Sequence, residues 1–388
     1  MTTAFPSSTY EQRTSALQNR LRKNGIDLGV ICDPDSVCYF AGFWNYLGIE
    51  FGRPTILVVP RDGPPTIIAP LMESEMCTRM TWVQDVRPWS DGVDGEWRSE
   101  LQRVIEGRSV RSVGIEKRLI PAMISIDLLP MLADRSIGDL GPIVSDLRQV
   151  KSPEEIAVMR KAGAVAIAMV DGAKGAIAED VPEYEVALAA INAGTRKAAE
   201  FLAPDADLFV SPTIYNLQIM QSGRDTCMVH RRSSTRRLRK GDPVYLCFCG
   251  IANFGNYKLG FDREFFVRTV TDEQARIYET TVKAQQAALG TVRPGIRCEE
   301  VNAAAEAVYR EAGFTPGYRT GRSIGCSFLE MPELKRGDAT SLAVGMTFAV
   351  DGGITVAGEF GGRVGDSIVV TESGFEYLTP YPRDLAIV

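Results

Sequence analysis

The chain has 388 residues, of which 45% are hydrophobic and 24% are charged. This length suggests two domains, and this composition is that of a globular protein rather than a disordered one. The 49 acidic residues outnumber the 43 basic ones, which argues against a general nucleic-acid-binding protein. No apolar run reaches the roughly 18 residues that span a membrane, and residues 1–6 do not resemble a secretory signal. We therefore expect a cytoplasmic protein with no membrane partner.

The cysteines and the histidine limit the possible chemistry. Eight cysteines are scattered without a CxxC pair, which is typical of reduced thiols. Cys247 and Cys249 are two residues apart in a strand-like run, so their side chains share a face. We interpret them as small apolar residues of a core strand, with a soft-metal pair as the alternative. His230 is the one histidine of the sequence.

The first 150 residues alternate helical and strand-like segments. A helix is expected to end near Gly25, a residue typical of helix C-termini, and a second helix is expected over 96–106. The expected strands are 28–32, 54–60, 66–70 and 113–116. This order predicts an α/β domain that closes near residue 150.

The remainder of the chain contains one pattern twice. Ser152 followed by Pro153 and two glutamates predicts the start of a long helix to about residue 175. A helix over 181–200 and a strand-rich stretch over 207–270 follow. A second pair of helices, 272–289 and 294–313, precedes further strands at 346–351 and 367–371. We infer an internal duplication, with a cleft for a small molecule between its halves.

Several segments, in this order, resemble the creatinase/prolidase/methionine-aminopeptidase superfamily, which has the pita-bread fold. They are residues 51–54, 151–160, 181–188 and 220–223, and the spacing from His230 through 240–242 to 262–263. The resemblance implies an α/β N-terminal domain over 1–150. It also implies an α+β pita-bread domain over 151–388 with an internal pseudo-twofold duplication.

The metallopeptidases of this superfamily bind two metal ions through Asp, Asp, His, Glu and Glu. In the matching positions this sequence has Cys247, Gly260, Arg322, Asp351 and Gly365. Four of the five ligands are absent, and a cationic side chain replaces the histidine. The resemblance therefore implies no metal and no cofactor, and it argues against a metallopeptidase.

Creatinase is a metal-free member of the superfamily, and its pattern implies roles for three residues. His230 matches a histidine that moves protons, and Asp262 and Asp351 match acidic residues that hold a guanidinium group. A neutral imidazole can take a proton from water near pH 7. Two carboxylates can hold a planar cation through charge-assisted hydrogen bonds.

The resemblance also implies substrate-binding residues. Arg53, with Phe51 beside it, matches an arginine that reaches the partner subunit's site, so a homodimer with Arg53 contributed across the interface is expected. Arg322 and Cys247 are expected in the pocket, and Glu330 is a candidate to neutralise Arg322. A cationic Arg322 disfavours creatine itself and favours an anionic or zwitterionic substrate.

These inferences predict a metal-independent creatinase-like hydrolase. Its substrate would be a small carboxylate-bearing guanidino, ureido or cyclic-amidine compound whose C–N bond is cleaved, with His230 as general acid/base. Two alternatives remain: a repurposed pita-bread enzyme for a tailoring step in small-molecule biosynthesis, and a non-catalytic dimeric binding protein. The basic run 231–240 is interpreted as a solvated loop or strand rather than a nucleic-acid site.

Overall fold

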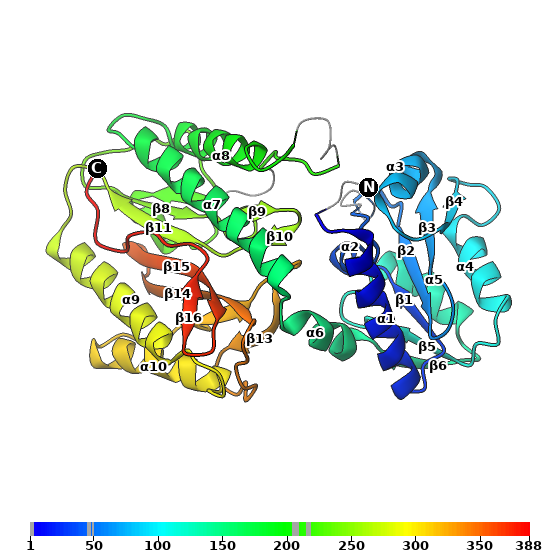
Figure 1. The fold of residues 1–388 in the computed structure, drawn as a ribbon. Helices are drawn as coiled ribbons and strands as arrows, with labels where there is room; N and C mark the ends of the chain where they lie inside the picture. Colours follow the sequence, from blue (N-terminus) through cyan, green and yellow to red (C-terminus); the bar gives the residue numbers. More distant parts are fainter. Residues whose placement is uncertain (1–3, 45–47, 49, 204–208, 215–218) are drawn as a thin grey trace. The chain divides into compact units, whose positions relative to one another are not determined.

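A computed structural model describes residues 1–388 except 1–3, 45–47, 49, 204–208 and 215–218 (Figure 1). The chain divides into two compact units, the first covering residues 1–148 and the second most of residues 149–388. Among the described residues, no helix is both long and apolar enough to cross a lipid bilayer.

The first unit is built on a six-stranded sheet in the order β4-β3-β2-β1-β5-β6. Its strands are β1 (Leu28–Ile31), β2 (Ile56–Pro60), β3 (Thr66–Pro70), β4 (Asp85–Trp89), β5 (Ser112–Ile115) and β6 (Ser136–Asp139). Its helices are α1 (Ser7–Lys23), α2 (Pro34–Ala41), α3 (Ser74–Met80), α4 (Trp97–Glu106), α5 (Ala122–Met131) and α6 (Gly141–Gln149). The predicted strands and the two predicted helices of this region are confirmed.

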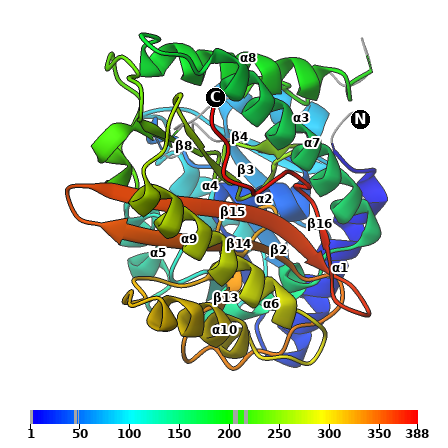
Figure 2. The ribbon, with the colours of Figure 1, turned by 90° about the vertical axis from the view of Figure 1, so that its left-hand side faces the viewer.

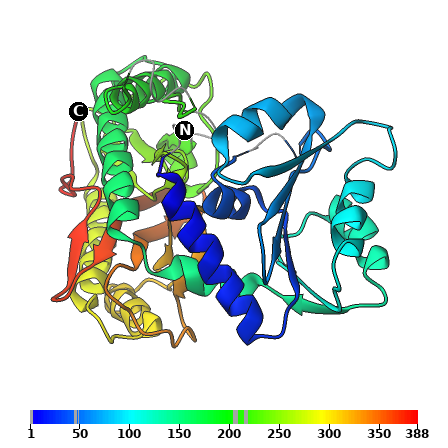
Figure 3. The ribbon, with the colours of Figure 1, turned by 45° about the vertical axis from the view of Figure 1, so that its right-hand side comes forward.

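Helices cover both faces of this sheet, as Figure 3 shows for α1 and for the pair α4 and α5. Leu28 and Val30 of β1 pack in a buried cluster with Trp97 and Leu101 of α4. Gly29 faces the other way, where a Cβ atom would lie 3.7 Å from Leu21 of α1. The alternation of side chains along β1 thus explains why both faces are apolar and covered.

A buried carboxyl group lies just after β5. Glu116 is 3% exposed, its Oε1 accepts a hydrogen bond of 2.9 Å from the Ser36 hydroxyl, and its Oε2 has no partner in the described residues. Burial, with the neighbouring charge of Asp33, raises the pKa of Glu116 from 4.5 to about 7.

This carboxyl group should make the first unit less stable as the pH rises. The unfolded chain releases the Glu116 proton near pH 4.5, whereas the folded chain keeps it up to about pH 7. The contribution of this proton to the free energy of unfolding is therefore fully present below pH 4.5 and is lost between pH 4.5 and about pH 7. The loss amounts to about 3 kcal/mol. Calorimetry should show a weaker pH dependence in Glu116→Gln. The exposed control Glu11→Gln should behave like the parent, and an equal slope in all three proteins would contradict the assignment.

The second unit contains an eight-stranded sheet in the order β13-β12-β14-β15-β11-β8-β7, with β16 paired to β15. Its strands are β7 (Ile219–Ser222), β8 (Pro243–Cys247), β11 (Asp262–Phe266), β12 (Gly321–Ser323), β13 (Glu330–Leu334), β14 (Thr347–Val356), β15 (Phe360–Val370) and β16 (Phe375–Tyr377). A separate hairpin joins β9 (Asn253–Phe254) and β10 (Tyr257–Lys258).

Two pairs of helices accompany this sheet: α7 (Pro153–Ala176) with α8 (Glu183–Ala199), and α9 (Asp272–Thr291) with α10 (Cys298–Glu311). Capping boxes start both long helices, from Ser152 with Glu155 and from Thr271 with Gln274. Each pair precedes a group of strands, so the predicted duplication and the pita-bread class are confirmed.

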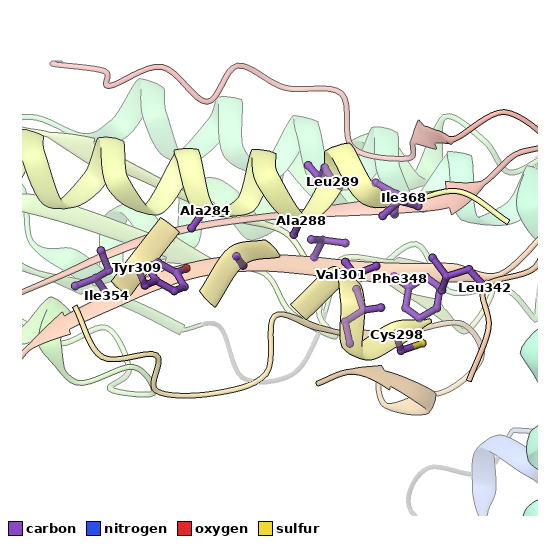
Figure 4. Close-up of a cluster of buried hydrophobic side chains, with 14 of the residues drawn as sticks. Ala284, Ala288, Leu289, Cys298, Val301, Tyr309, Leu342, Phe348, Ile354 and Ile368 are labelled. Carbon is purple, nitrogen blue, oxygen red and sulfur yellow. The ribbon is translucent and has the colours of Figure 1, made fainter. Parts of the chain in front are cut away.

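The core of the second unit lies between α9, α10 and one face of β14 and β15 (Figures 2 and 4). Phe348 and Ile368 point into this core together with Leu289 of α9. Gly352 and Gly362 allow α9 to lie close, because a Cβ atom on Gly352 would lie 2.5 Å from a carbonyl oxygen of α9. The residues that alternate with Phe348 and Gly352 on β14, and with Gly362 and Ile368 on β15, face the opposite side of the sheet. We call this side the inner face.

Candidate active site

A row of four residues crosses the inner face of the second sheet. Cys247 on β8 lies opposite Asp262 on β11, Asp262 lies opposite Gly365 on β15, and Gly365 lies opposite Asp351 on β14. Directly opposed residues in antiparallel strands project from the same face. The sheet register therefore gathers Cys247, Asp262 and Asp351, which the sequence predicted as pocket residues.

Cys249, two residues beyond Cys247, joins this row. Its Sγ atom lies 3.3 Å from Oδ1 of Asp262, and one ligand atom from each of Cys247, Cys249 and Asp262 lies within 4.8 Å of the others. The Cys249 hydrogen bond, burial and the Asp262 charge raise the pKa of Cys247. The interpretation of these two thiols as ordinary core residues was therefore incomplete, because both face an ionisable cluster.

Two carboxyl groups converge above Gly365. The position that a Cβ atom would take on Gly365 lies 2.8 Å from Oδ1 of Asp351 and 3.0 Å from Oδ2 of Asp262. Only glycine leaves this space to both carboxyl groups. Burial raises the pKa of Asp351 to about 6, with Arg322 opposing the shift and Asp262 adding to it.

Arg322 on β12 supplies the positive charge of the cluster. Its Nη1 donates a 2.8 Å hydrogen bond to Oδ2 of Asp351, and its guanidinium carbon lies 4.3 Å from the centre of the Phe328 ring. Burial lowers the pKa of Arg322, but the negative groups of Asp351, Cys249 and Asp262 outweigh burial and raise it. The Nε and Nη2 atoms are buried and have no acceptor among the described residues.

A second polar row lies beside the first. Glu264 on β11 opposes Tyr245 on β8, and Oε2 of Glu264 accepts a 3.2 Å hydrogen bond from the Arg363 main-chain N–H. Burial raises the pKa of Glu264 to about 8. The Arg363 side chain donates to the Gly362 carbonyl at 2.7 Å and also to the Ile354 carbonyl. Sequence reasoning missed this row, although each of its residues lies two positions from a residue of the first row, which is the spacing of one strand face.

His230 lies in an exposed turn after the short 3-10 helix Gly223–Cys227. In the described part of the chain, no hydrogen bond or ion pair joins His230 to Asp262 or Asp351. The structure thus brings together the two acidic residues of the predicted constellation. A role of His230 as a proton carrier stays a prediction.

Three other predicted binding residues lie outside the row. Arg53, in the first unit, forms a two-pronged ion pair with Asp91 of its own chain, at 2.7 and 2.9 Å, and Phe51 is 60% exposed. Glu330 forms a buried ion pair with Lys151 at 2.8 Å, so Lys151 neutralises this carboxylate. The binding roles of Arg53, Phe51 and Glu330 stay predictions.

The basic run 231–240 is fixed by acidic partners rather than solvated throughout. Arg231 donates to Glu183, whose side chain is fully buried, and Arg236 donates to Asp242 at 2.6 and 2.9 Å. Arg237 pairs with the exposed Asp180 at 3.3 Å. Arg237 is 60% exposed, in keeping with the interpretation as a solvated loop or strand, whereas Arg231 and Arg236 are bound in less exposed ion pairs.

The chain is similar to known proteins in both of its units. Residues 157–372 match the model of metallopeptidase family M24, and residues 13–150 match the creatinase/prolidase N-terminal domain. An agropine synthesis cyclase of Rhizobium rhizogenes is 29% identical over 96% of both chains. An Xaa-Pro dipeptidase of Lactobacillus helveticus is 28% identical over 96% of this chain and 98% of its own. The crystal structure of a Thermococcus sibiricus prolidase superposes with a TM-score of 0.86 and 25% identity, covering 98% of this chain and 99% of that one.

These findings support an enzyme of the prolidase-like hydrolase class, and they correct the predicted function. The prediction of a metal-independent creatinase-like hydrolase of guanidino, ureido or cyclic-amidine compounds is wrong, because the family is a metallopeptidase family and several relatives over the whole chain are dipeptidases. That prediction followed from a few creatinase-like site residues, whereas similarity over the whole chain joins this protein to dipeptidases and to a cyclase.

The family implies a pair of metal ions, and the side chains of the inner face show whether such a pair has room and ligands there. The Cβ position of Gly260 lies 3.1 Å from Nη2 of Arg322, and that of Gly365 lies between the carboxyl groups of Asp262 and Asp351. Arg322 and the two aspartates therefore fill the space of the missing ligands. The five positions thus do not fit the family's paired ions.

Proposed function

Because the chain belongs to metallopeptidase family M24, we propose that it hydrolyses a peptide-type amide bond in a small molecule such as a dipeptide. The observation that carries this proposal is the convergence of the Asp262 and Asp351 carboxyl groups above Gly365. The side chain of Asp351 is 16% exposed and Cys249 is partly exposed, so a small substrate can approach the row.

The proposed roles follow from the contacts of these side chains. A carboxylate of the converging pair accepts a proton from the attacking water and the pair returns a proton to the leaving nitrogen. Arg322, held on Asp351, offsets the negative charge that develops on the carbonyl oxygen. Because the row is largely buried, these charges act in a medium of low dielectric constant.

The proposal is tested with the purified chain and a panel of dipeptides, including Xaa-Pro dipeptides, and N-acyl amino acids, with products identified by mass spectrometry. We expect cleavage products that gain one water, and a loss of turnover of at least about 100-fold in Asp262→Asn. The control Asp180→Asn changes a 79% exposed residue and should retain activity. Unchanged activity of Asp262→Asn, or no cleavage in the panel, would refute the proposal.

A second candidate is intramolecular closure of an ester or amide. It is favoured by the match to the agropine synthesis cyclase over 96% of both chains. Ring closure uses the same acyl carbon as hydrolysis but replaces the attacking water by a group of the substrate itself. A linear hydroxy acid or amino acid should then give a product lighter by one water, which the same mass spectra distinguish from hydrolysis.

We also propose a homodimer in which Arg53 serves the partner's site. This role requires Arg53 to leave its ion pair with Asp91. Light scattering on a gel-filtration column should give twice the mass of the chain. Mixing the inactive variants Arg53→Met and Asp262→Asn should restore activity through mixed dimers, and mixtures that stay inactive would contradict a shared site.

A further inference from the structure

We propose that Cys247, Cys249 and Asp262 form a binding site for a single Zn²⁺ ion. Cys247 stands at one of the family's five ligand positions, but the site differs from the family's paired site because Cys249 and Asp262 occupy none of them. The site lies on the inner face that carries the proposed function. A part of the ion in catalysis rests on that function, whereas binding of the ion does not.

The spacing of the three side chains suits one tetrahedral ion. In a tetrahedral Zn²⁺ site with bonds of about 2.0–2.3 Å, neighbouring ligand atoms lie roughly 3.5–3.8 Å apart. Sγ of Cys249 lies 3.3 Å from Oδ1 of Asp262, and the three ligand atoms lie within 4.8 Å of one another. Small side-chain rotations are therefore enough to close the site, because β8 and β11 already hold the ligands on one face.

A second observation points to the same place. Oδ1 of Asp351 is buried without a hydrogen-bond partner in the described residues, and it shares the space above Gly365 with Asp262. An unpaired buried carboxylate oxygen is costly unless a cation or a donor meets it. Asp351 thus lies next to the three ligands with an oxygen available for the ion or for a water molecule bound to it.

Charge and ligand type select the ion. Two thiolates and two carboxylates would carry four negative charges, and Arg322 supplies one positive charge nearby. A divalent ion would offset most of the excess negative charge. The single positive charge of Arg322 therefore does not prevent the ion from binding. Mg²⁺ and Ca²⁺ prefer all-oxygen sites, whereas two thiolates favour Zn²⁺.

Arg322 also lies beside one of the three ligands. The Cβ position of Gly260 lies 3.1 Å from Nη2 of Arg322 and 3.7 Å from Sγ of Cys249, so the guanidinium group and the sulfur are neighbours. The Nε and Nη2 donors lack acceptors in the described structure, and a sulfur atom of Cys249 bound to the ion would offer Nη2 one. The arginine that replaces the family's histidine ligand therefore places a hydrogen-bond donor beside one ligand of the new site.

The test uses the purified full chain, stripped of metal and loaded with Zn²⁺ or with Co²⁺ as a spectroscopic probe. We expect about one ion per chain and a thiolate-to-cobalt charge-transfer band in the near ultraviolet. Cys249→Ser and Asp262→Asn should weaken binding at least about tenfold, since even outer partners of a metal site cost this much. The control Cys227→Ser changes a partly exposed thiol outside the row and should leave the band unchanged.

A second measurement uses only the parent chain, so that misfolding of a variant cannot be mistaken for loss of the ion. Zn²⁺ should protect Cys249 of the parent chain from alkylation, mapped by peptide mass spectrometry, and should leave Cys227 reactive. Absence of bound ion, a charge-transfer band and an affinity that Cys249→Ser leaves undiminished, or equal protection of both thiols would overturn the inference. Because no substrate is involved, these results stand apart from the amide-hydrolysis experiment.

Discussion

Replacing Arg322 by methionine is expected to lower the free energy of unfolding of the second unit by about 3–5 kcal/mol. Arg322 and Asp351 form an ion pair at 2.8 Å, with side chains 6% and 16% exposed. Removing the guanidinium group leaves a buried carboxylate without its partner, close to the charge of Asp262. The cost is that of an uncompensated buried charge rather than of a lost surface contact.

The double variant Arg322→Met with Asp351→Asn tests this explanation. Removing both charges of a buried pair costs much less than removing one, so the double variant should recover most of the lost stability. Urea unfolding followed by tryptophan fluorescence and far-ultraviolet dichroism measures both variants. A double variant as unstable as Arg322→Met would show that packing against Phe328, rather than charge, is what Arg322 contributes.

Replacing Gly163 by alanine should destabilise the second unit by about 3 kcal/mol, at the upper end for an overpacked site. Gly163 lies inside α7, and a Cβ atom there would lie 1.8 Å from the main-chain oxygen of Leu378. Main chain cannot move aside as a flexible side chain can. The C-terminal segment would therefore have to separate from α7.

Gly175 in the same helix provides the matched control. A Cβ atom at this position would meet nothing within 4 Å, so Gly175→Ala should stabilise the chain by about 0.5–1 kcal/mol. Thermal unfolding of the two variants beside the parent chain gives both signs in one experiment. A loss of stability of similar size in both variants would rule out the close contact with Leu378 as the cause.

Much of the fold could be predicted from local signals. Ser152 followed by Pro153 predicts the start of α7 because capping and a fixed proline φ act within one turn of helix. The order of helices and strands predicts the duplication, because each of these elements is recognised from its own local sequence. Long-range pairs carry no such signal: Lys151 and Glu330 are 179 residues apart, so their buried ion pair could not be read from either neighbourhood.

The candidate site was predictable in part. Alignment with a known family placed Cys247, Asp262 and Asp351 together, and the sheet register confirms their proximity. The alternation that put Cys249 on the same face also fits an apolar core strand, and composition alone does not separate the two. Arg322 was expected to repel cations, whereas its ion pair with Asp351 makes it part of the cluster.

Gly365 also constrains how this site can change by mutation. A larger residue there would collide with the carboxyl groups of both Asp262 and Asp351, so restoring the family's glutamate in one step should damage the present site before it creates another. The side chains of Asp262 and Asp351 would have to change first. Laboratory evolution toward a two-ion enzyme should therefore depend on the order of substitutions, with the glutamate at position 365 tolerated only late.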